Sequence, residues 1–175
     1  MHVYVYPFTC ESRGQELFLK FSQFPEIVSA VERRHFERLS SDQVQAFIHE
    51  HASDAVLTAI QARIAIQAPV PLVENPRLLK ADGFVRLNVL QAMKLELYRL
   101  YKENSRSVAD FARKIDRSET SVRRLLDVRH NSTIGDIEST IEILGKSLDH
   151  AWDIQVSPDV ARIKNATKAA STLIL

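Results

Sequence analysis

The chain has 175 residues, of which 45% are hydrophobic and 26% are charged, a composition typical of a globular protein and too apolar for a disordered one. Its formal net charge of +1 excludes a polyelectrolyte-like attraction of the whole chain to nucleic acid. Locally the charge differs: residues 1–83 carry 8 Lys and Arg against 10 Asp and Glu, whereas residues 113–130 carry 6 against 3. This asymmetry predicts two surfaces with different partners.

Cysteine and hydrophobicity patterns predict the compartment. The single cysteine, Cys10, excludes an intramolecular disulfide and any Cys-based metal site. No apolar run approaches the ~18 residues that span a bilayer, and the N-terminus lacks the pattern of a secretory signal. His49 and His51 point to different sides of a helix and have no evident third ligand. We therefore expect a cytoplasmic protein without membrane association, metal or cofactor.

Three short strands are predicted at the start of the chain. Aromatic and β-branched residues are dense in 2–8, and apolar residues alternate over 15–21. A turn is expected between them at 11–14. Phe24-Pro25 breaks the second run, and 26–31 predicts a third strand.

A helix and a fourth strand follow. Apolar residues at spacings of three and four predict a helix over 42–66, with an interruption near 51–53. Prolines make 68–83 an extended loop, and 84–87 alternates like a strand. The first 88 or so residues therefore predict one ββ(β)αβ unit.

The second half is predicted to be helical throughout. Apolar residues share one face over 89–103. Further helices fit 107–115, 118–127, 135–144 and 147–152. Five short helices with short connections are typical of a small DNA-binding domain, and the 156–175 tail has a helix-start signal at Ser157-Pro158.

Residues 107–128 fit a helix-turn-helix motif at its restrictive positions. Ala112 is small where two steeply crossing helices come close. Asp116 occupies the first turn position, which requires the left-handed region and favours Gly, then Asn or Asp. Val122 and Leu125 are expected to brace the second helix against the first, opposite Val108, Phe111 and Ile115.

These residues also fit an ordinary helical hairpin, in which they pack in the hydrophobic core and have no role in DNA binding. The downstream sequence favours the DNA-binding interpretation. Residues 132–137, followed by Ile141 and Leu144-Gly145-Lys146, are typical of the next helix and its glycine stop in a phage-repressor type of five-helix domain.

The second helix of such a motif places its N-terminal part against base edges in the major groove. Arginine binds guanine in bidentate fashion, whereas flanking basic residues contact phosphates. Ser118 is also the expected N-cap of that helix, so its hydroxyl is partly used locally. The candidate DNA-binding residues are Arg117, Ser118, Glu119, Thr120, Ser121, Arg123, Arg124, Arg129, His130 and Asn131.

Up to about residue 153, the order of motifs resembles the HicB-type antitoxins. The N-terminal marks are Phe21-Ser-Gln-Phe24-Pro25-Glu26, the helix 53–60 and the loop Pro69-Val-Pro71. The C-terminal marks are Phe111-Ala-Arg-Lys-Ile115, Arg124-Leu-Leu-Asp127, His130 and Leu144-Gly-Lys146. The chain departs from the family pattern at Gln23-Phe24, in about nine extra residues within 32–49 and in a longer tail.

The resemblance implies an α+β protein with two functions. A partial RNase H-like domain (1–83), with a small antiparallel sheet and one helix, would neutralise a small mRNA-cleaving HicA-like toxin. A strand and helix (84–104) would connect it to an all-α helix-turn-helix domain (105–155) that represses the operon through a palindromic double-stranded operator, and 156–175 would form a tail. The resemblance also implies self-association into dimers or tetramers.

The alternatives to an antitoxin are an enzyme and a plain transcriptional repressor. An RNase H-type active site needs several carboxylates converging on strand ends, and Glu11, Glu16 and Glu26 are predicted at turns and ends, so we expect no enzyme and no catalytic residue. Cys10 has no activating base and is expected to be a semi-buried residue. The alternative to an antitoxin is a prophage-type transcriptional repressor whose N-terminal domain only oligomerises or senses a ligand.

Overall fold

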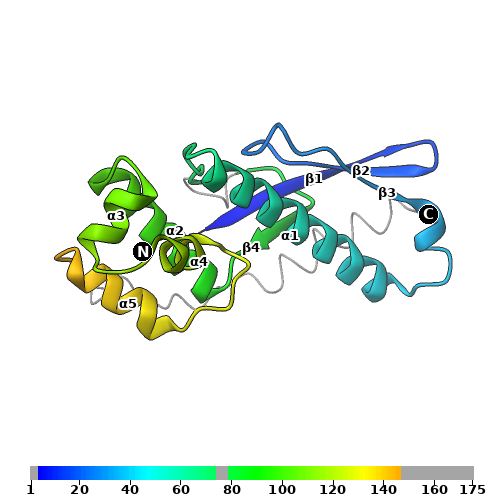
Figure 1. Cartoon of the computed structure of the whole chain (residues 1–175). Helices are drawn as coiled ribbons and strands as arrows, with labels where there is room; N and C mark the ends of the chain where they lie inside the picture. The colour runs from blue at the N-terminus through cyan, green and yellow to red at the C-terminus, as the bar shows by residue number, and fades with distance from the viewer. Residues whose placement is uncertain (1–3, 74–78, 147–175) are drawn as a thin grey trace. The chain divides into compact units, whose positions relative to one another are not determined.

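The protein is described by a computed structural model covering residues 4–73 and 79–146. These residues form four strands and five α-helices, so the chain is α+β, as the sequence predicts (Figure 1). In chain order the elements are β1 (Val5–Arg13), β2 (Glu16–Lys20), β3 (Ser29–Glu32), the 3-10 turn η1 (Arg33–His35), α1 (Ser41–Ala65), β4 (Gly83–Arg86), α2 (Val89–Asn104), α3 (Val108–Lys114), α4 (Glu119–Leu126) and α5 (Ile134–Ile143).

The chain divides into two compact units. We call the described part of 4–59 and 71–86 the sheet unit, and the described part of 60–70 and 87–146 the helical unit. The division falls inside α1, which begins in the sheet unit and ends in the helical unit.

The sheet unit contains one antiparallel sheet in the order β3-β2-β1-β4. Leu17 pairs with Val31, and Tyr6 pairs with Val85, so these buried residues share faces across neighbouring strands. Gly14 has φ +58° in the two-residue turn between β1 and β2, a conformation that glycine adopts without steric cost.

Two of the predicted strand boundaries are wrong. Residues 11–13, predicted as a turn, continue β1 and pair with 16–18. The cause is polar pairing on the solvent side of the sheet, where Glu11 forms ion pairs with both Arg13 and Lys20. The third strand begins at Ser29 rather than at residue 26, because turns occupy the residues directly after Pro25.

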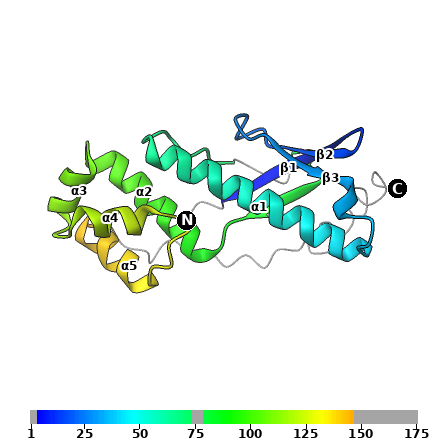
Figure 2. The ribbon, with the colours of Figure 1, turned by 45° about the vertical axis from the view of Figure 1, so that its right-hand side comes forward.

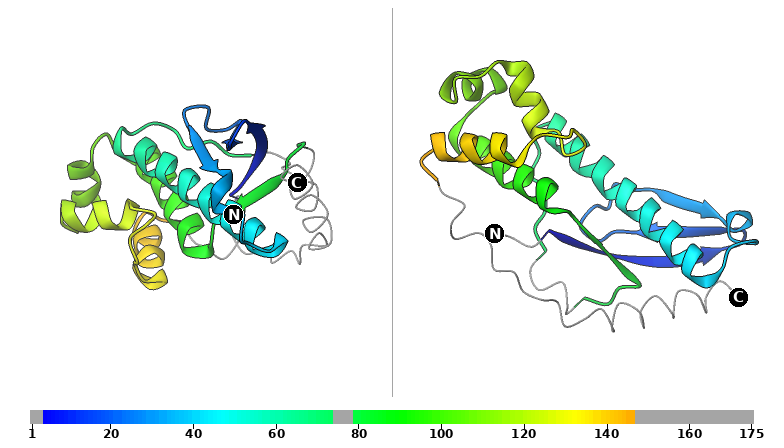
Figure 3. Two further views of the ribbon diagram at one scale, coloured as in Figure 1. Left: turned by 90° about the vertical axis from the view of Figure 1, so that its right-hand side faces the viewer. Right: turned by 90° about the horizontal axis from the view of Figure 1, so that it is seen from below.

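Helix α1 runs along one face of the sheet (Figures 2 and 3). It is continuous over Ser41–Ala65, so the predicted interruption near 51–53 is wrong. Ala52, at that place, is fully buried. Its small side chain lies on the apolar face and lets the continuous helix pack closely against its neighbours. The side of α1 that faces the sheet carries the buried Val44, Ile48 and Val56.

The helical unit has a core of aliphatic and aromatic side chains. Helix α2 begins with a capping box in which the Asn88 side chain accepts from the Gln91 backbone and the Gln91 side chain accepts from the Asn88 backbone. The rings of Tyr101 and Phe111 meet edge to face with centroids 5.2 Å apart. The predicted helices of this unit are confirmed to within two residues at each end. The predicted helix at 147–152 and the 156–175 tail lie outside the described residues.

Candidate nucleic-acid interface

A hydroxyl side chain caps the start of each short helix in the helical unit. Ser107 accepts from the Asp110 backbone at the start of α3, at 3.1 Å, and Ser118 accepts from the Ser121 backbone at the start of α4, at 3.2 Å. Thr133 caps α5 in the same way. The prediction that Ser118 is an N-cap is therefore confirmed, and its hydroxyl is engaged within the chain.

The turn between α3 and α4 depends on a left-handed residue. Asp116 has φ +50°, as predicted. The backbone of Arg117 donates to the carbonyl of Ala112 at 2.9 Å, and that of Asp116 donates to the carbonyl of Arg113 at 3.4 Å. These two bonds form a Schellman motif, which ends α3 and turns the chain into α4 within four residues.

The two helices pack against each other through the residues that the sequence singles out. Ala112, Val122 and Leu125 are buried, and Ile115 is buried at the turn. Val108 is only half-buried. Since α4 turns its apolar side towards α2 and α3, its polar side faces solvent.

Helix α4 carries five of the ten predicted contact residues. Glu119, Thr120, Arg123 and Arg124 are exposed, and Ser121 is half-buried. Arg123 lies 3.7 Å from Glu119 in an i,i+4 pair, which solvent screens. Among the described residues, Arg124 has no ion-pair partner, so its guanidinium is available to a ligand.

Arg117 lies beside α5 rather than standing free in solvent. Its guanidinium is 3.6 Å from the Asp136 carboxylate and 3.4 Å from the Ser139 hydroxyl. The hydroxyl of Thr133 donates to Asp136 at 2.6 Å, and this bond together with Arg117 lowers the pKa of Asp136 from its ordinary value. Sequence reasoning placed Arg117 at a phosphate; the structure adds a bond to α5.

The remaining predicted residues lie in the loop after α4. Arg129, His130 and Asn131 are exposed. The Asp127 carboxylate accepts from the Arg129 backbone at 2.9 Å, and the Asp127 carbonyl accepts from the His130 backbone at 3.1 Å. The loop is thus folded by its own side chains in the manner of an Asx turn.

Sequence reasoning missed Lys94, which lies in the middle of α2 and is fully buried. Its ammonium donates to three backbone carbonyls, those of Arg124, Asp127 and His130. A signal was present in the sequence: Lys94 lies four residues after Leu90 and three before Leu97, on the apolar side of the helix.

A hollow of about 580 Å³ at the junction of α2 and α3 was also missed. The basic side chains of Lys102 and Arg106 line it, and the buried Ser105 hydroxyl beside them has no hydrogen-bond partner in the structure. Asp110 lies in the same hollow, 3.5 Å from Lys114, so the positive charge is partly compensated there. All the lining residues lie within 102–114, so the short connection between α2 and α3 and its two flanks form the hollow.

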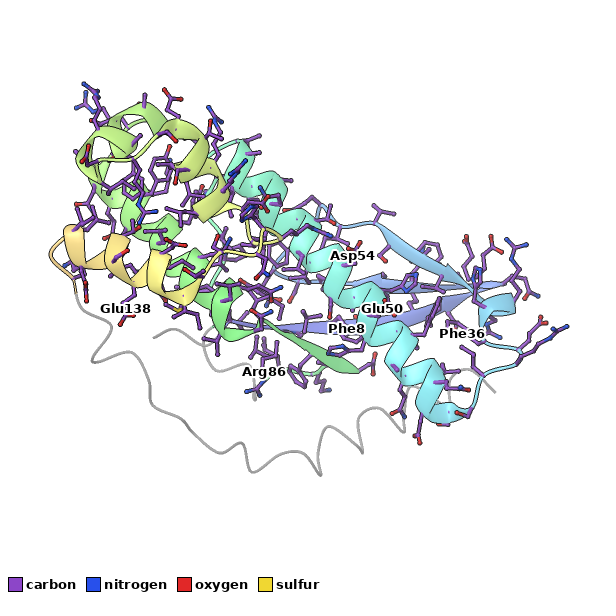
Figure 4. The ribbon with its side chains drawn as sticks, turned by 60° about the horizontal axis from the view of Figure 1, so that its bottom comes forward. Phe8, Phe36, Glu50, Asp54, Arg86 and Glu138 are labelled. Atoms are coloured by element: carbon purple, nitrogen blue, oxygen red, sulfur yellow. The ribbon has the colours of Figure 1, made fainter. Side chains whose placement is uncertain are left out.

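The sheet unit has a groove of about 390 Å³ whose lining includes Phe24, Pro25 and Ile27. The neighbouring Val28 side chain is 88% exposed, an unusual environment for a valine. On α1 the acidic Glu50 and Asp54 are exposed and one turn apart (Figure 4). These features fall on the N-terminal segment that carries the net negative charge.

Cys10 is half-buried in β1, next to Asp82. The Asp82 carboxylate accepts from the Cys10 backbone at 2.7 Å. Burial, reinforced by this negative charge, raises the pKa of the Cys10 thiol to about 12. The thiol is therefore protonated at neutral pH and is a poor nucleophile, as the sequence suggests.

Within the described residues, no group of three or more His, Cys, Asp or Glu side chains is placed to hold a metal ion. None of the described helices is both long and apolar enough to cross a membrane.

Comparison with known proteins gives a distant relative. No model of a known protein family matches the chain. Antitoxin HicB from Pseudomonas fluorescens (strain Pf0-1) is 28% identical over 107 residues, which cover 57% of this chain and 70% of that protein. The match supports the resemblance to HicB-like antitoxins that the motifs indicate.

Proposed function

We propose that α3 and α4 form a helix-turn-helix motif through which this protein binds operator DNA and represses its own operon. The observation that carries the proposal is the turn at Asp116. It joins two short helices across the small, buried Ala112 and leaves the start of α4 exposed. An ordinary helical hairpin does not require this combination of features.

In this proposal the residues of α4 divide by what they contact. Thr120, Arg123 and Arg124 face base edges, and Arg124 has the reach and the free donors for a bidentate bond to guanine. Arg129, His130 and Asn131 contact phosphates and set the register. Arg117 joins them from the turn, while Ser118, Glu119 and Ser121 shape the N-terminus of the helix.

We further propose that the sheet unit is a partial RNase H-like domain that neutralises a HicA-like toxin. The match to an antitoxin supports this role. The apolar part of the groove, at Phe24, Pro25 and Ile27, and the exposed Val28 supply the buried contact. Glu50 and Asp54 on α1 add negative charge that attracts a basic, RNA-binding partner and raises its association rate.

The chain acts as a regulatory protein rather than an enzyme in this account. It assembles as a homodimer or tetramer in the cytoplasm, so a symmetric pair of α4 helices meets a palindromic operator with half-sites one DNA turn, or a multiple of it, apart. The organisation proposed is 1–83 for toxin binding, 84–104 for connection, 105–155 for DNA binding and 156–175 as a tail.

Two variants separate the two activities. Arg124→Ala is expected to weaken operator binding while preserving growth rescue from a co-expressed HicA-like toxin. Val28→Asp is expected to weaken growth rescue from the toxin while preserving operator binding. Arg86→Ala on β4 and Val89→Asp at the start of α2 are matched controls, because both residues are exposed and lie outside the proposed contacts.

The outcomes are distinct. If either variant loses both activities while its circular dichroism spectrum shows an intact fold, the assignment of the two activities to separate surfaces is contradicted. DNA binding by the wild-type chain without any toxin binding supports instead a prophage-type repressor whose sheet unit only oligomerises or senses a ligand.

A further inference from the structure

Lys94 is the one lysine found fully buried among the described residues, and it lies on α2, a helix that carries none of the predicted DNA contacts. A buried lysine is costly unless its ammonium is bonded on all sides. Here each of its three N–H donors has a partner, since three carbonyl oxygens lie within hydrogen-bond distance. The surroundings of Lys94 therefore match the hydrogen-bonding capacity of its ammonium group.

The three carbonyls belong to the part of the interface that follows α4. The ammonium lies 3.1 Å from the carbonyl of Arg124, 2.7 Å from that of Asp127 and 2.7 Å from that of His130. The first is in the last turn of α4, the second is its C-cap, and the third is in the loop beyond. One side chain thus joins a helix end to a loop six residues further on.

The chemistry of a helix end explains why a cation occupies this place. The last four carbonyls of a helix have no intrahelical donor, and the helix dipole concentrates negative potential there. Burial lowers the pKa of Lys94, and the nearby charge of Asp127 opposes that shift. With these carbonyls bonded, the loop backbone has one preferred position relative to α4.

We infer that Lys94 is a positioning residue for DNA binding, which fixes the 127–131 loop so that Arg129 and His130 reach phosphates while α4 lies in the major groove. The inference rests on the proposed function. It adds a residue that touches no DNA and acts only through the backbone carbonyls it holds.

A double-mutant cycle tests the coupling. Affinity for DNA from upstream of the gene is measured by fluorescence anisotropy for Lys94→Met, Arg129→Ala and the double variant. Methionine keeps the length and apolar stem of lysine but donates no hydrogen bond. In the wild-type background we expect Arg129→Ala to weaken binding about tenfold, the size of one charge-assisted hydrogen bond. In the Lys94→Met background we expect that factor to fall to about twofold or less.

A second cycle separates positioning from stability. Thr120 lies in the first turn of α4, one helical turn before Arg124, and belongs to the helix rather than to the 127–131 loop that Lys94 is inferred to fix. The factor for Thr120→Ala should therefore be the same in both backgrounds. Thr140→Val is the matched control for loss of a buried hydrogen bond, because Thr140 is fully buried in α5 and donates to the Asp136 carbonyl at 2.7 Å. In that background the full Arg129→Ala factor should remain.

The results that overturn the inference are clear. If Arg129→Ala costs the same factor in the wild-type and Lys94→Met backgrounds, Lys94 only stabilises the core. If the wild-type chain does not bind the DNA at all, it is the proposed function that fails. Should Lys94→Met not fold, Lys94→Gln, which retains two donors, takes its place in the cycle. Amide hydrogen exchange on the wild-type chain adds a check without any variant: the His130 amide should be protected like those of α4, and exchange at an open-loop rate contradicts the inference.

Discussion

The guanidinium of Arg117 lies 3.6 Å from the carboxylate of Asp136, so the turn between α3 and α4 is joined to the first turn of α5. Thr133 caps that turn by accepting from the Asp136 backbone, and the Asp136 carboxylate accepts from the Thr133 hydroxyl. The α3–α4 turn therefore does not depend on local bonds alone, because a third helix holds its last residues.

This relationship predicts a particular acid sensitivity. The bond from Thr133 and the charge of Arg117 lower the pKa of Asp136 in the folded chain from its ordinary value. A lowered pKa means that the stabilisation is present above the unfolded-state pKa and is lost as the pH falls through the folded-state pKa. In urea titrations between pH 6 and pH 2, Asp136→Asn should be less stable than wild type at pH 6, and the difference should shrink below about pH 4. A difference that stays constant, or grows in acid, contradicts this role.

The left-handed backbone at Asp116 predicts a stabilising substitution. Glycine adopts positive φ without the steric cost that a Cβ brings, about 1 kcal/mol for a residue of this kind. Asp116→Gly should raise the free energy of unfolding by up to about that amount. Gly145, at φ +71° after α5, gives the reverse test, since a Cβ there meets no atom within 4 Å and only the backbone is strained. Gly145→Ala should lower stability, and an unchanged midpoint for both variants would show that these turns relax freely.

Tyr98 and Tyr101 are both buried in α2 but differ in the hydrogen bonding of their hydroxyls. Tyr98 donates to the carbonyl of Ala68 at 2.7 Å, whereas the Tyr101 hydroxyl has no partner in the structure. Tyr98→Phe should therefore lower the free energy of unfolding by about 1 kcal/mol. Tyr101→Phe should leave it unchanged or raise it, because it removes a buried polar group that is not satisfied. Equal losses in chemical denaturation of the two variants would contradict the assignment.

The buried thiol of Cys10 is expected to react slowly with disulfide reagents. With its pKa raised to about 12, the thiol is almost entirely protonated at pH 8, and the thiolate is the reactive form. A disulfide reagent should label the native chain far more slowly than the urea-unfolded chain, whose single cysteine has an ordinary pKa. Labelling at the same rate in both states would mean that β1 is open at this position.

Features governed by neighbouring residues could be predicted from the sequence. The caps at Ser118 and the left-handed Asp116 follow local rules of helix ends, and both are confirmed. The alternation of Leu17 and Leu19 correctly predicts the buried face of β2. The predicted hairpin turn begins three residues too early, because the ion pair of Glu11 with Lys20 depends on a partner strand that the local pattern does not show.

Features that depend on distant residues could not be predicted in this way. The three carbonyl partners of Lys94 lie 30 to 36 residues further along the chain. The bond from Arg117 to Asp136 likewise arises only when separate helices come together. A charged residue on the apolar side of a helix is the visible warning of such a contact, but its partner is set by the tertiary fold.

The most direct test of the central claim is a titrated band shift with DNA from upstream of the gene against shuffled DNA of equal length. The wild-type chain should prefer the upstream DNA by about 10³-fold or more, with affinity falling steeply as salt rises. Arg124→Ala should lose most of this preference, while Arg86→Ala keeps it. Equal binding of both DNAs by the wild-type chain, or a preference that survives Arg124→Ala unchanged, would contradict the assignment of α4 as the helix that reads the operator.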